Sequence, residues 1–301
     1  MFFIDIIIFI VIFVYVHKYS VCINAIKHMK GNLFDVSGKV MVMTGACGIL
    51  GGTIVKYFAA QGVKVVILDL ERAAETGHRL VDEIKAEGGE ACFLPTNVLD
   101  KAVLEENHKV VLEKYGRVDI LMNAAGGNMA SATVPPDKTI FDLDVDAVKK
   151  VTELNLFGTI IPTMVFARSM AEQKEGSIIN FASESALRPL TRVAGYGVAK
   201  AAVANWTKYL CAELAMKFGE GLRVNAIAPG FLLTNQNRTL LTNPDGSLTQ
   251  RSHTILAHTP INRFLEPEEL LGTLHWLASD ASKAVTGTVA VVDGGFDAFS
   301  I

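Results

Sequence analysis

Residues 39–69 read KVMVMTGACGILGGTIVKYFAAQGVKVVILD: a short apolar run, a glycine-rich turn, a stretch of helical length and a second apolar run. Apolar, β-branched runs that alternate with helical patterns are typical of β-α-β units on a parallel sheet. Both runs are continuously apolar, as expected for strands that helices cover on both faces. This segment therefore predicts the start of an α/β fold, with the glycine turn at the carboxyl end of its first strand.

The same alternation continues along the chain and predicts seven strands. Their expected bounds are 39–44, 64–69, 91–96, 119–124, 177–182, 223–228 and 288–293. No internal repeat or Pro/Ser-rich linker divides them, so we expect a single domain over residues 33–301. Within it, the segment at about 231–265 is expected to form a substrate loop.

Composition excludes several classes of protein. Half of the 301 residues are hydrophobic, enough for a substantial core, and the net charge is -3 with acidic and basic residues interspersed. No basic face for nucleic acid is expected. The four cysteines are scattered and form no C-x-x-C pair, so we expect neither a disulfide framework nor a metal site. A reducing, cytoplasmic location fits this pattern best.

The first 32 residues form an apolar extension. Residues 6–16 are an unbroken apolar run, shorter than the roughly 20 residues of a spanning helix, and no basic residue precedes it as in a secretory signal. Because the sequence from Met29 reads as a complete domain start, we expect translation to begin there. The other interpretation is a weak anchor. Membrane contact is expected only if residues 1–20 are retained.

The glycine turn departs from the strict G-x-G-x-x-G fingerprint, because Gly45, Gly48 and Gly51 are spaced G-x-x-G-x-x-G. Such a turn lets the backbone approach a pyrophosphate at a helix N-terminus, although an ordinary strand-to-helix turn also favours glycine. Asp69 ends the second strand 18 residues after Gly51, close to the spacing of a carboxylate that binds the adenosine ribose. Its charge would repel a 2′-phosphate, so the sequence favours NAD over NADP.

Ser183, Tyr196 and Lys200 carry the strongest chemical signal. Tyr196 and Lys200 are four residues apart on an expected helix and so share a face. A phenol is a poor acid at neutral pH, but an adjacent ammonium stabilises the phenolate and lowers its pKa. A proton donor is therefore expected here, downstream of a dinucleotide turn and of a serine at a strand end.

With these motifs in order, residues 33–301 resemble the short-chain dehydrogenase/reductase family. The matching motifs are TGACGILG (44–51), Asp69, NAAGG (123–127), LNLFG (154–158), Ser183, Y-x-x-x-K (196–200) and PGFLLT (229–234). The resemblance implies a Rossmann-type, doubly wound fold with a seven-stranded parallel sheet and helices on both faces. It also implies four catalytic residues: Tyr196 as proton donor, Ser183 to orient the carbonyl, Lys200 to hold the nicotinamide ribose, and Asn155 to support a proton relay.

The resemblance further implies a set of cofactor contacts. They are Gly45, Gly48, Ile49, Leu50, Gly51, Asp69, Asn97, Val98, Asn123, Ala124, Ala125, Gly126, Tyr196, Lys200, Pro229, Gly230, Leu232 and Thr234. Two of them depart from the family pattern. Ile49 stands where glycine is usual, and Asn97 replaces an Asp, although its carbonyl oxygen can still accept from the adenine amino group.

Within the family, the pattern is most similar to the bacterial D-mannonate oxidoreductases, also called fructuronate reductases. The similar stretches include the glycine turn, FASESALRPLTR (181–192) and VDGGFDAFS (292–300). A sugar acid needs cations and amides around it, and the candidates are Asn128, Arg188, Arg192 and Asn235. For each arginine, a surface or subunit-interface charge is the alternative interpretation.

The resemblance therefore implies an NAD-dependent enzyme that interconverts D-fructuronate and D-mannonate. The alternatives are another sugar-acid or polyol dehydrogenase, such as a gluconate 5-dehydrogenase, or a nucleotide-sensing protein without turnover. The family's habit of pairing the helices that carry Asn155 and Tyr196 implies a homodimer or homotetramer.

Overall fold

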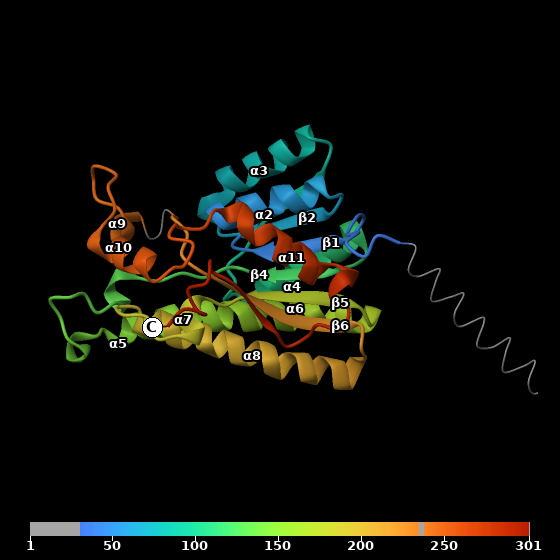
Figure 1. Cartoon of the computed structure of the whole chain (residues 1–301). Helices are drawn as coiled ribbons and strands as arrows, with labels where there is room; N and C mark the ends of the chain where they lie inside the picture. Colours follow the sequence, from blue (N-terminus) through green and yellow to red (C-terminus); the bar gives the residue numbers. More distant parts are fainter. Residues whose placement is uncertain (1–30, 235–237, 301) are drawn as a thin grey trace, which may run out of the picture.

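A seven-stranded parallel sheet forms the centre of the molecule (Figure 1). The computed structural model describes residues 31–234 and 238–300. The strands are β1 (Val40–Thr44), β2 (Lys64–Asp69), β3 (Glu90–Pro95), β4 (Ile120–Asn123), β5 (Gly176–Phe181), β6 (Leu222–Pro229) and β7 (Val289–Val292). They are ordered β3-β2-β1-β4-β5-β6-β7. All seven expected strands are confirmed, each within one residue of its expected ends, whereas the expected apolar extension lies almost wholly outside the described residues.

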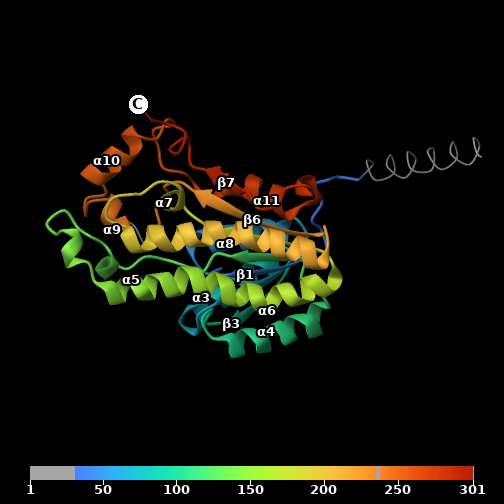
Figure 2. The ribbon, with the colours of Figure 1, turned by 90° about the horizontal axis from the view of Figure 1, so that it is seen from below.

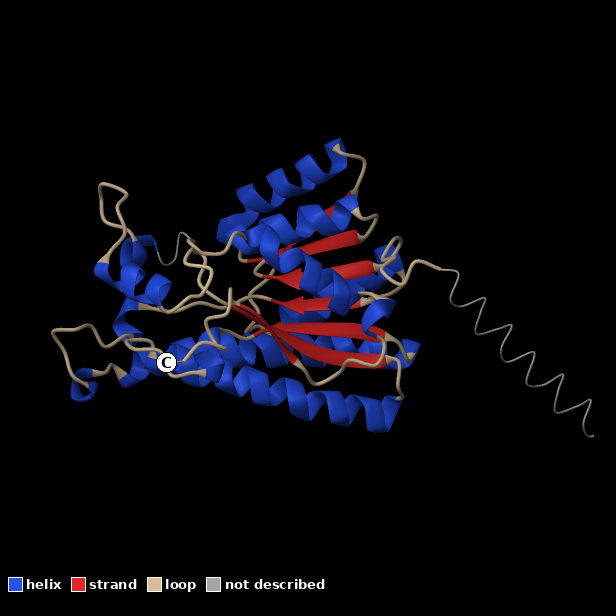
Figure 3. Cartoon of the chain, viewed as in Figure 1, coloured by secondary structure: helices blue, strands red, loops and turns tan. Residues whose placement is uncertain are grey.

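Helices cover both faces of the sheet (Figure 3). On one face pack α2 (Ile49–Ala60), α3 (Ala74–Ala86) and α11 (Leu271–Ala278), and on the other α4 (Lys101–Tyr115), α6 (Gly158–Gln173) and α8 (Ala194–Phe218). Alternate residues of β1 serve the two faces: Met41 and Met43 join the core under α2, and Val40 and Val42 join the core under α6. The continuously apolar strands are thus explained, and the doubly wound fold is confirmed.

The direction of strand order reverses between β1 and β4, which are neighbours in the sheet but not in the chain. The helix after β1 lies on one face and the helices after β4 lie on the other. The loops that leave the carboxyl ends of β1 and β4 therefore diverge and leave a crevice, which is where open α/β sheets bind their ligands. The catalytic candidates and the glycine turn all follow carboxyl ends of strands or lie on the helices behind them.

A long helical run lies behind this crevice. It consists of α5 (Val145–Thr152), a π-helical turn at Glu153–Phe157, and α6, which runs alongside α8 (Figure 2). By length and composition this run could cross a membrane, yet 56% of its most apolar window is buried within the protein. Phe166 and Met170 of α6 are fully buried in the core beneath the sheet. The run is thus accounted for as a core element.

The segment at 231–265 contains more regular structure than a loop. It carries α9 (Arg238–Leu241) and α10 (Gln250–Ala257), and Leu232 pairs with Leu265 where the segment begins and ends. Leu241 and Ile255 pack with Phe296 in a small core of their own. The described part of the segment, residues 231–234 and 238–265, is therefore a packed cap, held against the C-terminal residues, at the carboxyl edge of the sheet. Its part in binding substrate stays a prediction.

Candidate active site

Thr44 and Gly45 join the turn after β1 to the loop after β4. Gly45 has φ +66°, and a Cβ placed on it would lie 2.8 Å from the backbone of Ala125. The hydroxyl of Thr44 accepts hydrogen bonds from the backbone N–H groups of Ala124 (3.2 Å) and Ala125 (3.1 Å). Glycine is required at position 45 both by its conformation and by this contact. Thr44 is a site residue that the sequence-based set did not include.

The N-terminus of α2 is open. Its N-cap, Gly48, is exposed, has no side chain to cap the helix, and is followed by no acidic residue in the first turn. The first backbone N–H groups of a helix have no partner within it and carry the positive end of its dipole. This end fits a pyrophosphate. Ile49 is the first helical residue, so the missing family glycine imposes no strain here.

Gly51 has a different role from the one its place in the fingerprint suggests. A Cβ at this position would lie 2.6 Å from the Cα of Ala46 and from the carbonyl oxygen of Gly45. The residue is buried. Gly51 therefore lets α2 pack directly against the preceding turn, and it does not present an open surface to a ligand.

Asp69 lies beside the same turn. Its Oδ2 accepts a hydrogen bond from the backbone N–H of Cys47 (2.9 Å), and its Oδ1 accepts one from Leu70 (2.8 Å). Burial, followed by the negative charge of Asp69, raises the pKa of the Cys47 thiol to about 12. The thiol therefore stays neutral next to the carboxylate. With spare lone pairs on both oxygens, Asp69 can still accept from ribose hydroxyls.

Asn97 and Val98 follow β3. The Oδ1 atom of Asn97 accepts a hydrogen bond from the backbone N–H of Leu99 (3.1 Å), which uses one of its two lone pairs. Val98 is buried, and a Cβ on Gly158 would lie 2.9 Å from its Cγ2 atom. Asn97 thus retains an acceptor for an adenine amino group, whereas the side chain of Val98 packs against the start of α6.

The side chain of Asn123 lies in a buried polar network, and its part in binding the cofactor stays a prediction. Its Nδ2 donates to Thr163 (2.8 Å) on α6 and to Asn180 (2.9 Å) on β5, and Asn180 in turn donates to Thr207 (2.9 Å) on α8. All four side chains are buried. They form a polar network that fixes β4 and β5 to the helices behind them. The network uses the amide nitrogen of Asn123, whereas its Oδ1 atom has no hydrogen-bond partner among the described residues.

Ser183, Tyr196 and Lys200 converge at the carboxyl end of β5. Ser183 caps α7 (Glu184–Leu187), and its Oγ accepts from the backbone N–H of Ser185 (3.3 Å). Burial raises the pKa of Tyr196, and a hydrogen bond with Ser183 lowers it in part. The Nζ atom of Lys200 lies over the Tyr196 ring, 5.7 Å from its centre, and donates to the carbonyl oxygen of Phe181 (2.7 Å).

Asn155 occupies the π-helical turn between α5 and α6. Its Oδ1 accepts from the N–H of Gly127 (3.1 Å), and its Nδ2 donates to the carbonyl oxygens of Gly127 (2.7 Å) and Val151 (2.8 Å). A Cβ on Gly126 would lie 2.5 Å from Oδ1 of Asn155 and 3.2 Å from Nζ of Lys200. The loop after β4 is therefore locked over Asn155 and Lys200. π-Helical turns frequently occur at functional sites.

The end of β6 closes the site on the side of β7. Pro229 ends the strand, and a Cβ on Gly230 would lie 2.6 Å from the Cα of Asp293. Leu232 is buried and paired with Leu265, and the carbonyl oxygen of Thr234 accepts from the backbone N–H of Arg238 (2.9 Å). Gly230 thus lets the chain pass close to the segment after β7.

Comparison with known proteins identifies the fold family. The profile of the family described as enoyl-(acyl carrier protein) reductase matches residues 45–297. The chain belongs to the short-chain dehydrogenase/reductase family. It is an oxidoreductase that uses a nicotinamide dinucleotide, and the open N-terminus of α2 beside Asp69 fits such a cofactor.

Similar members of this short-chain dehydrogenase/reductase family include both sequences and solved structures. The Bacillus subtilis (strain 168) relative, named uncharacterized oxidoreductase UxuB, is 43% identical over 276 residues, covering 88% of this chain and 97% of the relative. The structure of a proposed D-mannonate oxidoreductase from Haemophilus influenzae with bound NAD is 39% identical, with a TM-score of 0.81, covering 88% of this chain and 97% of that one. The gluconate 5-dehydrogenase from Burkholderia cenocepacia, in complex with NADP and tartrate, is 28% identical, with a TM-score of 0.78, covering 89% and 98%.

The substrate candidates of this dehydrogenase differ in their surroundings. Arg188 is committed to Asp297: its Nε donates to Oδ1 (2.8 Å) and its guanidinium also donates to the carbonyl oxygen of Asp297. Its charge is already neutralised, so a role in binding a substrate carboxylate gains no support. Asn128 accepts from the backbone N–H of Met129 through its own Oδ1 (2.9 Å). Arg192 pairs with no carboxylate of residues 31–234 or 238–300, and Asn235 lies outside the described residues.

Two charged residues near the site escaped the sequence-based set. Glu184, directly after Ser183, is 1% exposed, and burial together with the charges of Asp293 and Asp297 raises its pKa to about 8. Arg251 on α10 donates to the carbonyl oxygen and hydroxyl of Thr191, both at 3.1 Å. No sequence motif marks either residue. Glu184 resembles any polar residue at the start of a helix, and Arg251 is 59 positions along the chain from Arg192, which lies near it in space.

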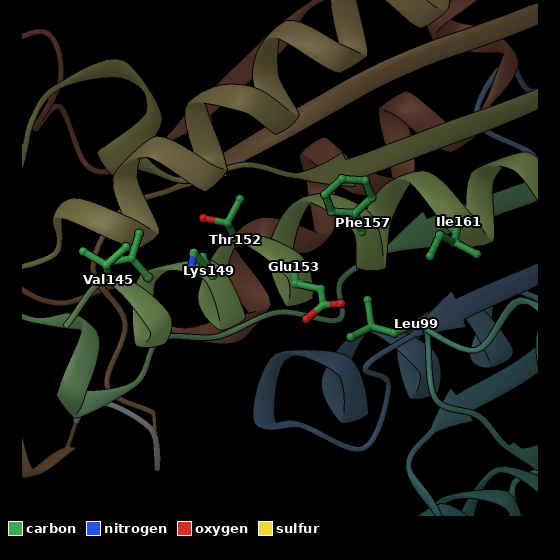
Figure 4. A pocket seen from close by; sticks show the side chains of 8 residues that line it. Leu99, Val145, Lys149, Thr152, Glu153, Phe157 and Ile161 are labelled. Atoms are coloured by element: carbon green, nitrogen blue, oxygen red, sulfur yellow. The ribbon is translucent and has the colours of Figure 1, made fainter.

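A separate hollow of about 490 Å³ lies outside the catalytic centre (Figure 4). Its lining comes from α5, the π-helical turn, the start of α6 and the loop before α4: Leu99, Val145, Val148, Lys149, Thr152, Glu153, Phe157 and Ile161. None of these is a catalytic candidate. The hollow belongs to the outer surface of the helical run that carries Asn155.

Proposed function

We propose that this enzyme interconverts D-fructuronate and D-mannonate with NAD(H). The observation that carries the proposal is Arg192, a cation on the loop that connects Ser183 to Tyr196, which forms no ion pair with residues 31–234 or 238–300. A cation held next to a carbonyl-reducing centre suits a substrate that is both a ketone and an acid. The relative from Haemophilus influenzae supports this choice, since its proposed activity is that of a D-mannonate oxidoreductase.

The four catalytic candidates divide the work of carbonyl reduction. Ser183 donates a hydrogen bond to the substrate carbonyl oxygen, and Tyr196 gives a proton to that oxygen as negative charge develops on it. When bound, the nicotinamide supplies the hydride for reduction and accepts it for oxidation. Burial lowers the pKa of Lys200 to about 8, so this ammonium can exchange a proton near neutral pH. Asn155 holds the loop after β4 over Lys200.

The cofactor proposed for this reaction is NAD. Asp69 places a carboxylate at the end of β2, next to the turn that would hold the pyrophosphate. This carboxylate accepts hydrogen bonds from ribose hydroxyls and repels a 2′-phosphate. The bound NAD of the relative from Haemophilus influenzae supports the same choice.

We propose that the protein is a homo-oligomer, most simply a tetramer, that pairs its α6 and α8 helices. On α8, Val198, Tyr209 and Met216 are 58–78% exposed, and their spacing of eleven and seven residues places them on one face. Met164 of α6 is 60% exposed, and the apolar hollow of Figure 4 adjoins the start of the same helix. Exposed apolar side chains on neighbouring helices are typical of a subunit interface. A monomer in light scattering would contradict the proposal.

The main alternative substrate is a ketogluconate. The Burkholderia cenocepacia gluconate 5-dehydrogenase shares the fold but is less similar in sequence, at 28% identity. Product analysis distinguishes the two: with D-mannonate and NAD, nuclear magnetic resonance should detect D-fructuronate, and oxidation of D-gluconate alone would favour the alternative. A nucleotide sensor without turnover would oxidise neither acid.

A further inference from the structure

Arg192 and Arg251 lie close together although 59 residues separate them in the chain. The guanidinium of Arg251, from α10, donates to the hydroxyl and the carbonyl oxygen of Thr191, each at 3.1 Å. Arg192 is the next residue in the chain. Burial, and then the charge of Arg192, lowers the pKa of Arg251, as expected for two neighbouring cations.

No acidic side chain among residues 31–234 and 238–300 neutralises this pair. The ion pairs of arginine in this part of the chain join Arg79 to Glu83, Arg117 to Asp119, Arg188 to Asp297 and Arg263 to Glu269. Both Arg192 and Arg251 are partly buried. Two half-buried like charges are unfavourable without a counter-ion, so the arrangement is suited to an anion that comes from outside the chain.

The backbone holds Arg192 in an unfavourable conformation. Its φ of +74° lies in the left-handed region, which is unfavourable for a residue with a side chain. The carbonyl oxygen of Arg192 accepts from the backbone N–H of Val134 (3.0 Å). Strain that surrounding contacts maintain in this way often marks a functional position.

The backbone of Arg192 is tied to the segment that packs against the catalytic tyrosine. Val134, which binds the backbone of Arg192, follows Ala132 by two residues, and Ala132 belongs to the apolar cluster against which Tyr196 packs. Arg192 itself is four residues before Tyr196. An anion held by the two arginines would thus belong to a molecule whose other end reaches the proton donor.

We propose that Arg192 and Arg251 together bind the carboxylate of the substrate and make Arg251 of α10 a determinant of acid specificity. The proposal rests on the proposed function, because it identifies the recognition element for a sugar acid in the same site. A guanidinium matches a carboxylate with two parallel hydrogen bonds, and two guanidiniums offer enough donors for both oxygens. It also assigns a role to the cap at 231–265, which carries Arg251 to the site.

Kinetics with an acid and its neutral counterpart test this assignment. D-Fructose has the carbon skeleton of D-fructuronate, with a hydroxymethyl group in place of the carboxylate. Arg251→Met and Arg192→Gly should each raise KM for D-fructuronate about 10- to 100-fold while kcat/KM for D-fructose changes less than twofold. Glycine adopts the backbone conformation of residue 192 without strain, so folding is not at risk. Arg79→Met, on the exposed face of α3, is the matched control.

A binding measurement tests the carboxylate site without requiring that D-fructuronate be the substrate. With NAD present, D-gluconate should raise the Tm of the wild-type protein more than the neutral polyol D-glucitol does. The excess should disappear in Arg251→Met and Arg192→Gly and persist in Arg79→Met. If wild-type protein shows no excess for the acid, or if both site variants retain it, the carboxylate site is overturned, whether or not D-fructuronate is turned over.

Discussion

The Nζ atom of Lys200 lies over the ring of Tyr196, 5.7 Å from its centre, and not at the phenol oxygen. The ammonium is held there by the carbonyl oxygen of Phe181 and by the close approach of Gly126. Burial favours the neutral form of both groups. It raises the pKa of Tyr196 and lowers the pKa of Lys200 to about 8. Tyr196 is therefore kept protonated, as a donor must be, and Lys200 is able to return a proton near neutral pH.

Replacing Tyr196 by Phe should remove the proton donor and leave the rest of the site in place. We expect kcat for keto-acid reduction to fall about 10²- to 10⁴-fold, the usual contribution of a positioned acid. The Kd for NADH, measured by fluorescence titration, should change little. Retained turnover in Tyr196→Phe would show that another group protonates the substrate.

Replacing Gly48 by Asp should stabilise the protein and weaken cofactor binding at once. Gly48 is an exposed N-cap with φ -71°, so an Asp fits without strain and can cap α2, a gain of about a few tenths of a kcal/mol over glycine. Its charge would occupy the end of the helix where a pyrophosphate is expected. Urea denaturation and NADH titration measure the two effects, and unchanged NADH affinity would contradict the placement of the pyrophosphate.

Gly51→Ala serves as the contrast to that substitution. Because its Cβ would lie 2.6 Å from the backbone of Ala46 and from the Gly45 carbonyl oxygen, the turn and α2 must move apart. We expect a loss of stability of about 1–3 kcal/mol from this overpacking. If the Gly51→Ala protein were stable and had lost only NADH affinity, Gly51 would instead be a contact for the pyrophosphate, as the glycine fingerprint suggests.

Asp69→Asn should weaken the preference for NADH over NADPH. The amide keeps one oxygen that can accept from the Cys47 N–H, gives up the hydrogen bond from the Leu70 N–H, and removes the negative charge. We expect the ratio of kcat/KM for NADPH to that for NADH to rise about tenfold, equivalent to about 1.4 kcal/mol. Asp82→Asn, on the exposed side of α3, is the control. An unchanged ratio would remove Asp69 as the selective group.

Glu184 should make the protein less stable as the pH rises. Below about pH 4.5 the carboxyl is protonated in both states, but between 4.5 and about 8 the unfolded chain ionises while the folded protein keeps the proton, so stability falls. The difference between 4.5 and about 8 bounds the loss at about 5 kcal/mol.

Glu184→Gln should therefore have a higher Tm than the wild-type protein at pH 8–9. The variant keeps the charged neighbours of Glu184, which are Asp293, Asp297 and Arg188. At pH 4 the two proteins should be close in Tm. A variant that loses stability equally at both pH values would show that Glu184 is needed as a packed carboxyl and not as a titrating one.

The fold could be predicted from the sequence because burial on both faces leaves an unambiguous pattern. Each strand is a short apolar run, and its neighbours alternate with helices, which constrains the sheet to parallel strands. The cap at 231–265 was less predictable. Its helices α9 and α10 are short and polar, and what fixes them is packing against Phe296, near the end of the chain.

The site was predictable where chemistry requires fixed spacing and unpredictable where it depends on contacts. Tyr196 and Lys200 meet because they are one helical turn apart. The role of Gly51 depends on how closely α2 approaches the turn, and that of Asn123 on partners in α6 and β5. The pairing of Arg188 with Asp297 joins residues 109 positions apart. A sequence pattern contains no record of such distances.

The most direct test of the account is the initial rate of NADH oxidation by the purified protein with D-fructuronate, 5-keto-D-gluconate, D-fructose or cyclohexanone, each repeated with NADPH. We predict that D-fructuronate with NADH gives the highest kcat/KM of the panel, and that both the neutral ketones and NADPH lower it by at least tenfold. Activity on cyclohexanone that equals or exceeds activity on D-fructuronate would contradict the assignment of this site to a sugar acid.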